Sequence, residues 1–219
     1  MKKYYVNVNQ GGDVFWHKDD ECLIVHREDG PAIEFACGDK FWFIDGERHR
    51  DEGPAIEYVT GSKVWYCHGK LHRADGPAVM RTDGFEEWWV DGRLHREDGP
   101  AIVKADGTKM WFINGKCHRE DGPAVMRTDG FDEWWVDGRL HREDGPAIVK
   151  ADGGKFWFVN GKRHRLDGPA IELSNGRKMW YINGVQLTEE EFLERTRPVE
   201  ELTVAQIEQL LGKRVKIIK

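Results

Sequence analysis

A unit of 23 residues repeats without insertion or deletion along most of this chain, and it constrains the fold more than any other feature. The dipeptide His-Arg opens each unit, at positions 26, 49, 72, 95, 118, 141 and 164, and a tryptophan recurs with the same step from Trp42 to Trp180. A fixed period of this length indicates an array of small supersecondary units. Each unit of such an array buries its apolar face only against its neighbours.

A second level of repetition lies on top of the first. Residues 72–117 and 118–163 differ at only six positions, so a block of two units has been copied whole. Recent copying preserves residues whether or not they have a function. The identity of the two blocks therefore does not mark a functional site.

Each unit carries two turn signals, in most units Asp-Gly or Asn-Gly between short apolar runs, which is the sequence cue for a two-residue type I′ hairpin turn. If Asp106-Gly107 forms such a turn, Ile102 lies opposite Trp111. The repeated tryptophan then faces an isoleucine or valine in every unit, a pair that contributes roughly 0.2–1 kcal/mol. The same register places Lys104 opposite Lys109, a like-charge pairing that exposure to water must weaken.

The second turn of the unit, such as Asn114-Gly115, leads into a longer stretch that contains a proline. Proline cannot donate to a strand ladder, so it belongs at the first residue of a strand or at an edge. We therefore predict an all-β repeat, an elongated and twisted antiparallel β-meander of tandem 23-residue hairpin units with two strands each.

The ends of the chain depart from the repeat, as the caps of an array should. We expect residues 1–25 to form an N-terminal cap and a degenerate first unit that contains Trp16. Residues 26–187 then form the tandem repeats, and residues 188–219 form a C-terminal helical cap with a short strand.

Two capping boxes predict the helices of this C-terminal cap. Thr188 precedes Glu191, and Thr203 precedes Gln206, at the spacing in which the two residues satisfy each other's backbone donors. The apolar residues of 214–218 predict a last short strand.

Charge, hydropathy and cysteine usage restrict the setting in which the protein works. The net charge of −6 provides no basic excess for neutralising nucleic-acid phosphate, which disfavours a nucleic-acid partner. The sequence contains no run of about 18 apolar residues, the length that a membrane-spanning helix needs, and the N-terminus lacks the apolar core of a signal peptide. The four cysteines form no Cys-x-x-Cys pair, which fits free thiols in a reducing compartment. We therefore expect a soluble, intracellular protein.

Alternation of side chains along the strands predicts two different faces. Ile102, Trp111 and Ile113 define a first face that is apolar in every unit and is expected to be core. The second face carries the residue after each tryptophan, which is always aromatic, and the residue before it, which is apolar except at Glu87 and Glu133. Aromatic residues mixed with charge are typical of interaction surfaces. The C-terminal helices could instead cover this face.

The candidate binding residues lie on the second face and on the ladder of arginines: Trp89, Trp135, Glu87, Glu133, Phe112, Phe158, Arg96 and Arg119. The arginines could bind a polyanion. A parallel ladder of aspartates two residues further along favours internal pairing instead.

Seven histidines beside acidic residues suggest a metal site, but the expected geometry opposes it. Equivalent residues of neighbouring units should lie two strands apart, roughly 10 Å. Zinc requires its nitrogen ligands at about 2.0–2.1 Å, so histidines of successive units should not share one ion. We predict structural histidines, no metal and no cofactor. The sequence also contains no nucleophile–base arrangement and no phosphate-binding glycine loop, so we predict that the protein is not an enzyme.

The unit resembles the MORN repeat and its bacterial and phage variants, most clearly at residues 160–164, Asn-Gly-Lys-Arg-His, and at Gly168 with Asn175-Gly176. The resemblance extends over about residues 22–184. The sequence departs from the family where His-Arg-x-Asp-Gly-Pro-Ala replaces His-Gly-x-Gly. The resemblance implies an elongated, twisted single-layer sheet used for protein or lipid contact, and not for catalysis. We expect the protein in the cytoplasm of a bacterium or of an infected host cell.

Two hypotheses of function follow. In the first, the protein is a non-catalytic scaffold, phage or bacterial, whose aromatic face binds a protein partner or a second copy of itself. In the second, it is a phage-type inhibitor of host defence that sequesters a small nucleotide, with aromatic rings stacking on the base and arginines holding the phosphate. Attachment to anionic lipid is a third hypothesis, which the negative net charge disfavours.

Overall fold

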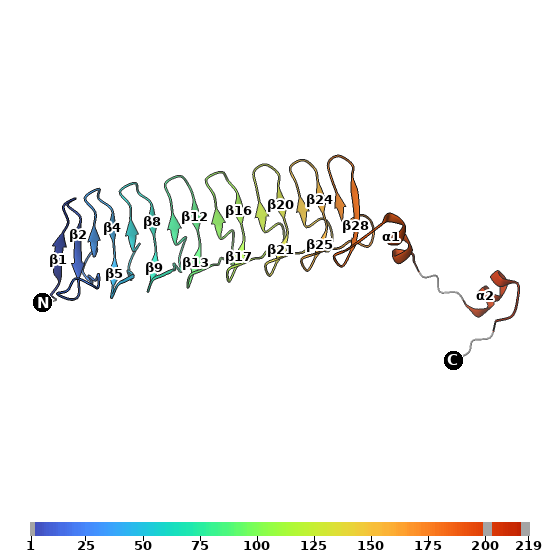
Figure 1. Cartoon of the computed structure of the whole chain (residues 1–219), viewed down its shortest axis with the longest axis horizontal. Coiled ribbons are helices and arrows are strands. Elements are labelled where there is room, and N and C mark those ends of the chain that lie inside the picture. Colours follow the sequence, from blue (N-terminus) through green and yellow to red (C-terminus); the bar gives the residue numbers. More distant parts are fainter. Residues whose placement is uncertain (1–2, 199–202, 216–219) are drawn as a thin grey trace.

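The computed structural model describes residues 3–198 and 203–215, and it shows an elongated all-β array followed by two short helices (Figure 1). The strands form one long antiparallel meander in which neighbours in the sheet follow one another along the chain, with a row of small hairpins beside it. The predicted all-β repeat with a helical C-terminal cap is confirmed.

Seventeen strands build the meander sheet, in the order β1 (Tyr5–Val8), β2 (Val14–His17), β3 (Ile33–Glu34), β4 (Lys40–Phe41), β7 (Ile56–Glu57), β8 (Lys63–Val64), β11 (Val79–Met80), β12 (Glu86–Glu87), β15 (Ile102–Val103), β16 (Lys109–Met110), β19 (Val125–Met126), β20 (Asp132–Glu133), β23 (Ile148–Val149), β24 (Lys155–Phe156), β27 (Ile171–Glu172), β28 (Lys178–Ile182) and β29 (Val185–Leu187). The hairpins are β5 (Phe43–Ile44) with β6 (Glu47–Arg48), β9 (Tyr66–Cys67) with β10 (Lys70–Leu71), β13 (Trp89–Val90) with β14 (Arg93–Leu94), β17 (Phe112–Ile113) with β18 (Lys116–Cys117), β21 (Trp135–Val136) with β22 (Arg139–Leu140), and β25 (Phe158–Val159) with β26 (Lys162–Arg163). The helices are α1 (Glu189–Thr196) and α2 (Val204–Leu211).

A regular unit contains four short strands and not the two that we predicted. In the unit 95–117, two strands belong to the meander sheet and two form the hairpin. The strand breaks at Trp111, whose backbone N–H donates to the carbonyl of Ala124 in the next unit at 2.8 Å. The tryptophan therefore connects two units through its backbone at the point where the chain leaves the sheet.

The predicted hairpin register is wrong by one residue. Ile102 pairs with Met110 and not with Trp111. Lys104 is hydrogen-bonded to Thr108, with 2.9 Å between N and O, so it does not face another lysine. Cross-strand partners share a face of the sheet, and Ile102 therefore lies on the face of Met110 and not, as predicted, on that of Trp111.

The error in register arises from the type of turn. In a type I′ turn both central residues have positive φ, but here only Gly107 does, at 85°, which makes the loop 105–107 three residues long. The Asp106 carboxylate supports this loop by accepting the Thr108 N–H at 2.9 Å. The second turn is type I′ as predicted, with φ of 50° at Asn114 and 79° at Gly115.

The core of the array is a ladder of alanines, one from each unit. All of them are completely buried: Ala32, Ala55, Ala78, Ala101, Ala124, Ala147 and Ala170. Among the described residues no large side chain is completely buried, and the repeated tryptophans are only half-buried. The sheet is therefore thin, and its stability depends on contacts between neighbouring units.

The two ends close the array differently. At the N-terminal end, Trp16 N–H donates to the Ala32 carbonyl at 2.9 Å, the same bond that the later tryptophans make. At the other end, Thr188 and Thr203 each form both bonds of a capping box, which confirms the two predicted helices. Residues 214–215 form no strand, and the rest of the predicted last strand, 216–219, lies outside the described residues.

Candidate functional site

The link, the stretch from His-Arg to Ala that opens each unit, contacts the tryptophan of the unit before it. The guanidinium of Arg119 lies over the Trp111 ring, with Cζ at 4.1 Å from the ring centroid. All seven links repeat this contact at 4.0 to 4.2 Å. A cation over an indole face contributes on the order of 0.5–2 kcal/mol. Because arginine and tryptophan come from consecutive units, we call this contact the joint between units.

Hydrogen bonds fix the same guanidinium within its own link. Arg119 Nε donates to Asp121 at 2.8 Å, and Nη1 donates to the carbonyl of Pro123 at 3.2 Å. The predicted internal pairing of arginine with aspartate is confirmed in six links. The exception is Arg50, which instead reaches Glu57 at 2.9 Å.

The joints lower the pKa of the aspartates. In five links the hydrogen bond from arginine, and then its positive charge, holds the pKa of the aspartate below its ordinary value of 3.8: Asp75, Asp98, Asp121, Asp144 and Asp167. Arg96 and Arg119 therefore already have a carboxylate, a carbonyl and an indole as partners. A nucleotide phosphate would have to compete with all three.

Acid should weaken the array through these carboxylates. A group with a lowered folded-state pKa stabilises the fold fully above its unfolded pKa and loses this effect as the pH falls through the folded pKa. We therefore expect the thermal midpoint to fall below about pH 3.8, although each exposed pair contributes little. The double variant Asp121→Asn/Asp144→Asn should show a shallower acid decline than the wild type, and equal slopes would contradict this expectation.

Each histidine of the His-Arg pair supports the type I′ turn of its own unit. His95 Nδ1 accepts the backbone N–H of Asn114 at 3.1 Å, and the other six links form the equivalent bond. In each unit the histidine thus ties the start of the link to the turn that closes the same unit. This is a structural role, as the sequence predicted.

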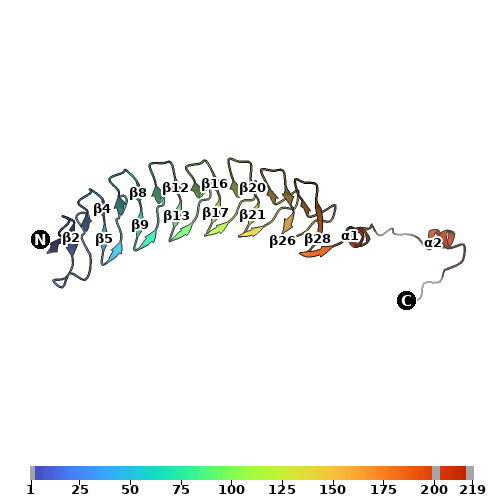
Figure 2. The same cartoon turned by 45° about the horizontal axis from the view of Figure 1, so that its top comes forward.

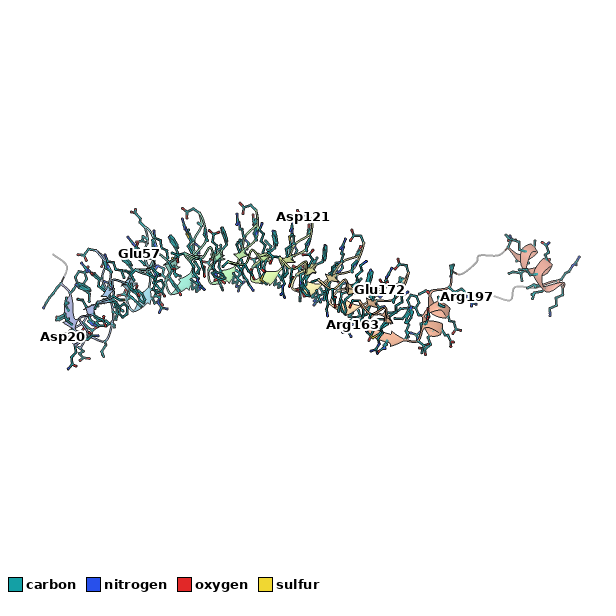
Figure 3. All side chains as sticks on the ribbon, turned by 90° about the horizontal axis from the view of Figure 1, so that it is seen from above. Asp20, Glu57, Asp121, Arg163, Glu172 and Arg197 are labelled. Atoms are coloured by element: carbon teal, nitrogen blue, oxygen red, sulfur yellow. The ribbon has the colours of Figure 1, made fainter. Side chains whose placement is uncertain are left out.

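A row of clefts lies between consecutive links on one side of the sheet. The cleft between the fourth and fifth links, which open at His95 and His118, has a volume of about 540 Å³ and is lined by Trp111 and Ile113. Exposed carboxylates form its rim, among them Glu97 at 85% and Asp121 at 83% exposure. Seen from above, the array bows into an arc, and Asp121 lies on its outer side (Figure 3). The convex face is therefore acidic.

Successive side chains of a strand point to opposite sides, so the residue between cleft-lining Trp111 and Ile113, and its equivalent in each unit, points toward the concave side and is always aromatic. We call this set the concave row, and it consists of Phe43, Tyr66, Trp89, Phe112, Trp135, Phe158 and Tyr181. Arg163 points to the inner side of the arc (Figure 3), and its guanidinium lies 5.9 Å from the Phe158 ring and 5.3 Å from the Tyr181 ring. Six members are half-buried, and Tyr181 is buried next to the helical end.

Two glutamates interrupt the apolar part of this face. Glu87 lies between Val79 and Ile102 across the sheet, and its Oε2 accepts the indole N–H of Trp89 at 3.0 Å. Glu133 accepts from Trp135 at the same distance. The two carboxylates therefore hold the two largest rings of the concave row in a fixed position.

The described part of the C-terminal tail leaves the concave row uncovered along the regular units. Both helices lie beyond the last strands of the array (Figure 1), and a view turned by 45° shows the same (Figure 2). Helix α1 contacts β28 and β29 at the end of the sheet. Phe192, which is 3% exposed, is the buried residue of this helix.

Six of the eight candidate residues lie along one side of the array, spread over four successive units. Trp89, Trp135, Phe112 and Phe158 belong to the concave row, and Glu87 and Glu133 support it. Arg96 and Arg119 lie on the other side of the sheet, in the links.

One cluster was missed by the sequence analysis. His49, Cys67 and His68 offer ligand atoms that all lie within 4.8 Å of one another. His49 belongs to the repeated His-Arg pairs, whereas His68 lies in a turn and is not part of that pattern. The departure of residues 67 and 68 from the repeat could have revealed the cluster.

The comparisons with known proteins add no family. No protein-family model matches the chain, and no curated protein matches it. Among the described helices, none is long and apolar enough to cross a membrane.

Proposed function

We propose that this protein is a non-catalytic scaffold that binds a protein partner, or a second copy of itself, through the concave row. The observation that carries the proposal is the row of aromatic side chains, repeated from unit to unit and uncovered by the described tail. Curved repeat arrays characteristically bind along their concave surfaces. Tryptophan and tyrosine are also the side chains that contribute most often to binding hot spots.

The composition of the concave face supports a protein as the partner. Aromatic rings, methionine and arginine are enriched in protein interfaces, and Met110, Met179 and Arg163 accompany the row. The fixed indoles of Trp89 and Trp135 lose little conformational entropy on binding, because their glutamate bonds already hold them. The resemblance of the unit to MORN variants supports a bacterial or phage cytoplasm as the setting.

The first experiment is native mass spectrometry of the chain purified gently from the cells that produce it. Clean multiples of the chain mass indicate self-association, and a larger excess identifies a bound protein. An excess of the size of a small molecule would instead favour the nucleotide hypothesis.

The double variant Trp89→Ala/Trp135→Ala tests the surface itself. We expect it to raise the Kd for the partner, or for self-association, about 30-fold, on the order of 2 kcal/mol, because two central hot-spot rings are removed. The matched control is Glu97→Gln/Glu143→Gln on the convex face, which should bind like the wild type. Circular dichroism checks that both variants fold, and an unchanged Kd for the tryptophan variant would contradict the proposal.

A further inference from the structure

One unit differs from all others at its type I′ turn. Six units have isoleucine or valine followed by aspartate or asparagine there, whereas the unit 49–71 has Cys67-His68. His68 adopts the left-handed conformation of this turn position, with φ of 44°. The turn therefore forms with its usual geometry but presents a thiol and an imidazole in place of an alkyl group and a carboxylate or amide.

His49 is the third metal-binding group, and it is brought to Cys67 and His68 by the hydrogen bond that joins histidine and turn in every unit. His49 Nδ1 accepts the His68 N–H at 3.1 Å, and the two imidazole rings stack with centroids 4.1 Å apart. One ligand atom from each of these histidines and from Cys67 lies within 4.8 Å of the other two.

The link of this unit also departs from the others. Asp51 lies two residues after His49, at a position where four other links have glutamate. Its Oδ1 is 3.1 Å from His49 Nε2. The corresponding glutamates lie at 3.6 to 3.9 Å. Asp51, His49 and Cys67 line one cleft of about 520 Å³. A carboxylate is thus added to the thiol and the two imidazoles.

We propose that Cys67, His68 and His49 bind one zinc ion, with Asp51 as the nearby carboxylate. Thiolate and imidazole are the ligands that zinc prefers, and three such ligands with a carboxylate or water complete a tetrahedron. Zinc at Nε2 of His49 leaves the proton of the ring on Nδ1, so the ion replaces the hydrogen bond that His68 N–H donates to Nδ1. Asp51, whose Oδ1 is 3.1 Å from the same Nε2, is placed to occupy the fourth position.

The exposure of two of the ligands, and the small movement that they need, allow zinc to bind at this cluster. Zinc at about 2.0–2.3 Å from each ligand requires ligand atoms roughly 3.5 Å apart, somewhat closer than they are here. Cys67 and His68 are exposed, so their side chains can rotate toward the ion without disturbing packing. His49, which is 8% exposed, provides the fixed side of the site. The bound ion would clamp the hairpin of this unit to its own link.

The test compares the untagged wild-type chain with the variant Cys67→Val/His68→Asn. This variant recreates the Val-Asn pair of residues 159–160, so the repeat itself shows that it is compatible with the fold. Calorimetric titration with zinc should give one equivalent for the wild type and at least 100-fold weaker binding for the variant. Titration with cobalt should give the visible bands of a tetrahedral ion and a thiolate charge-transfer band in the wild type only.

The variant Cys117→Val controls for the loss of a cysteine elsewhere in the chain. Burial raises the pKa of the Cys117 thiol to about 12. That variant should bind zinc like the wild type. Wild-type chain that binds no ion, a double variant that binds equally well, or a cobalt complex without the thiolate band would overturn the proposal. None of these outcomes affects the concave row, which lies in other residues.

Discussion

Arg119→Ala is expected to lower the free energy of unfolding by about 2–5 kcal/mol, the largest effect of any single side-chain truncation in the links. The change removes the guanidinium from the Trp111 ring, where it lies at 4.1 Å, and leaves the Pro123 carbonyl without its donor. A lost cation–π contact costs roughly 0.5–2 kcal/mol, and a lost hydrogen bond to a charged group about 1.5–3 kcal/mol. Urea denaturation followed by tryptophan fluorescence measures the sum.

Arg127→Ala is the matched control. Arg127 also has an ion pair, with Asp129 at 2.9 Å, and lies 5.3 Å from the Phe131 ring, but its side chain is 51% exposed and both of these partners belong to its own unit. We expect a change below about 1 kcal/mol. Arg119→Lys should recover only part of the loss, because lysine lacks the planar fork that contacts ring, carboxylate and carbonyl together. Equal effects of the two alanine variants would contradict the role of the joint.

Ala101→Leu is expected to destabilise the array by about 1–3 kcal/mol or to prevent folding. Ala101 is 0% exposed, and its carbonyl accepts the Trp88 N–H at 2.8 Å, so a larger side chain has no room unless that bond yields. The thermal midpoint and the urea midpoint both measure the effect. Because the alanine lies where two units meet, the damage should spread to the neighbouring unit.

Ala105→Leu provides the control for added volume. Ala105 is exposed in the three-residue loop, and the equivalent residue of another unit is Val59, 66% exposed. We expect a change within about 0.5 kcal/mol. If leucine at residue 101 were tolerated as well as leucine at residue 105, the alanine ladder would not be the tightly packed core described above.

The period of the repeat was enough to predict the class of fold, but it could not determine the register within a unit. Asp106-Gly107 fits a two-residue turn and a three-residue turn equally well, because glycine serves both and the aspartate can cap the loop with its carboxylate. The strands are only two residues long, so hydrophobic alternation offered too few positions to decide. The sequence therefore predicts Trp111 in a strand pair, whereas in the structure the strand breaks there and Arg119 covers the ring.

Only part of the candidate site could be predicted, because some of its contacts depend on the register and turns of the folded unit. The concave row could be recognised from the sequence, because the position after the repeated tryptophan is aromatic in every unit. The cluster of His49, Cys67 and His68 was not, since a separation of 19 residues becomes a contact only through the bond between histidine and turn. That bond repeats in every link, so it could be inferred only after the fold was known.

The uniformity of the joint has a genetic consequence. Each unit meets the next through the same arginine, indole and backbone bond, so recombination between two copies of the repeat in the gene creates a junction identical to those already present. Loss or gain of a whole unit then changes the length of the rod without creating a new folding problem. The near-identical blocks 72–117 and 118–163 record the gain of two units at once, and the length of the rod can therefore change in whole units.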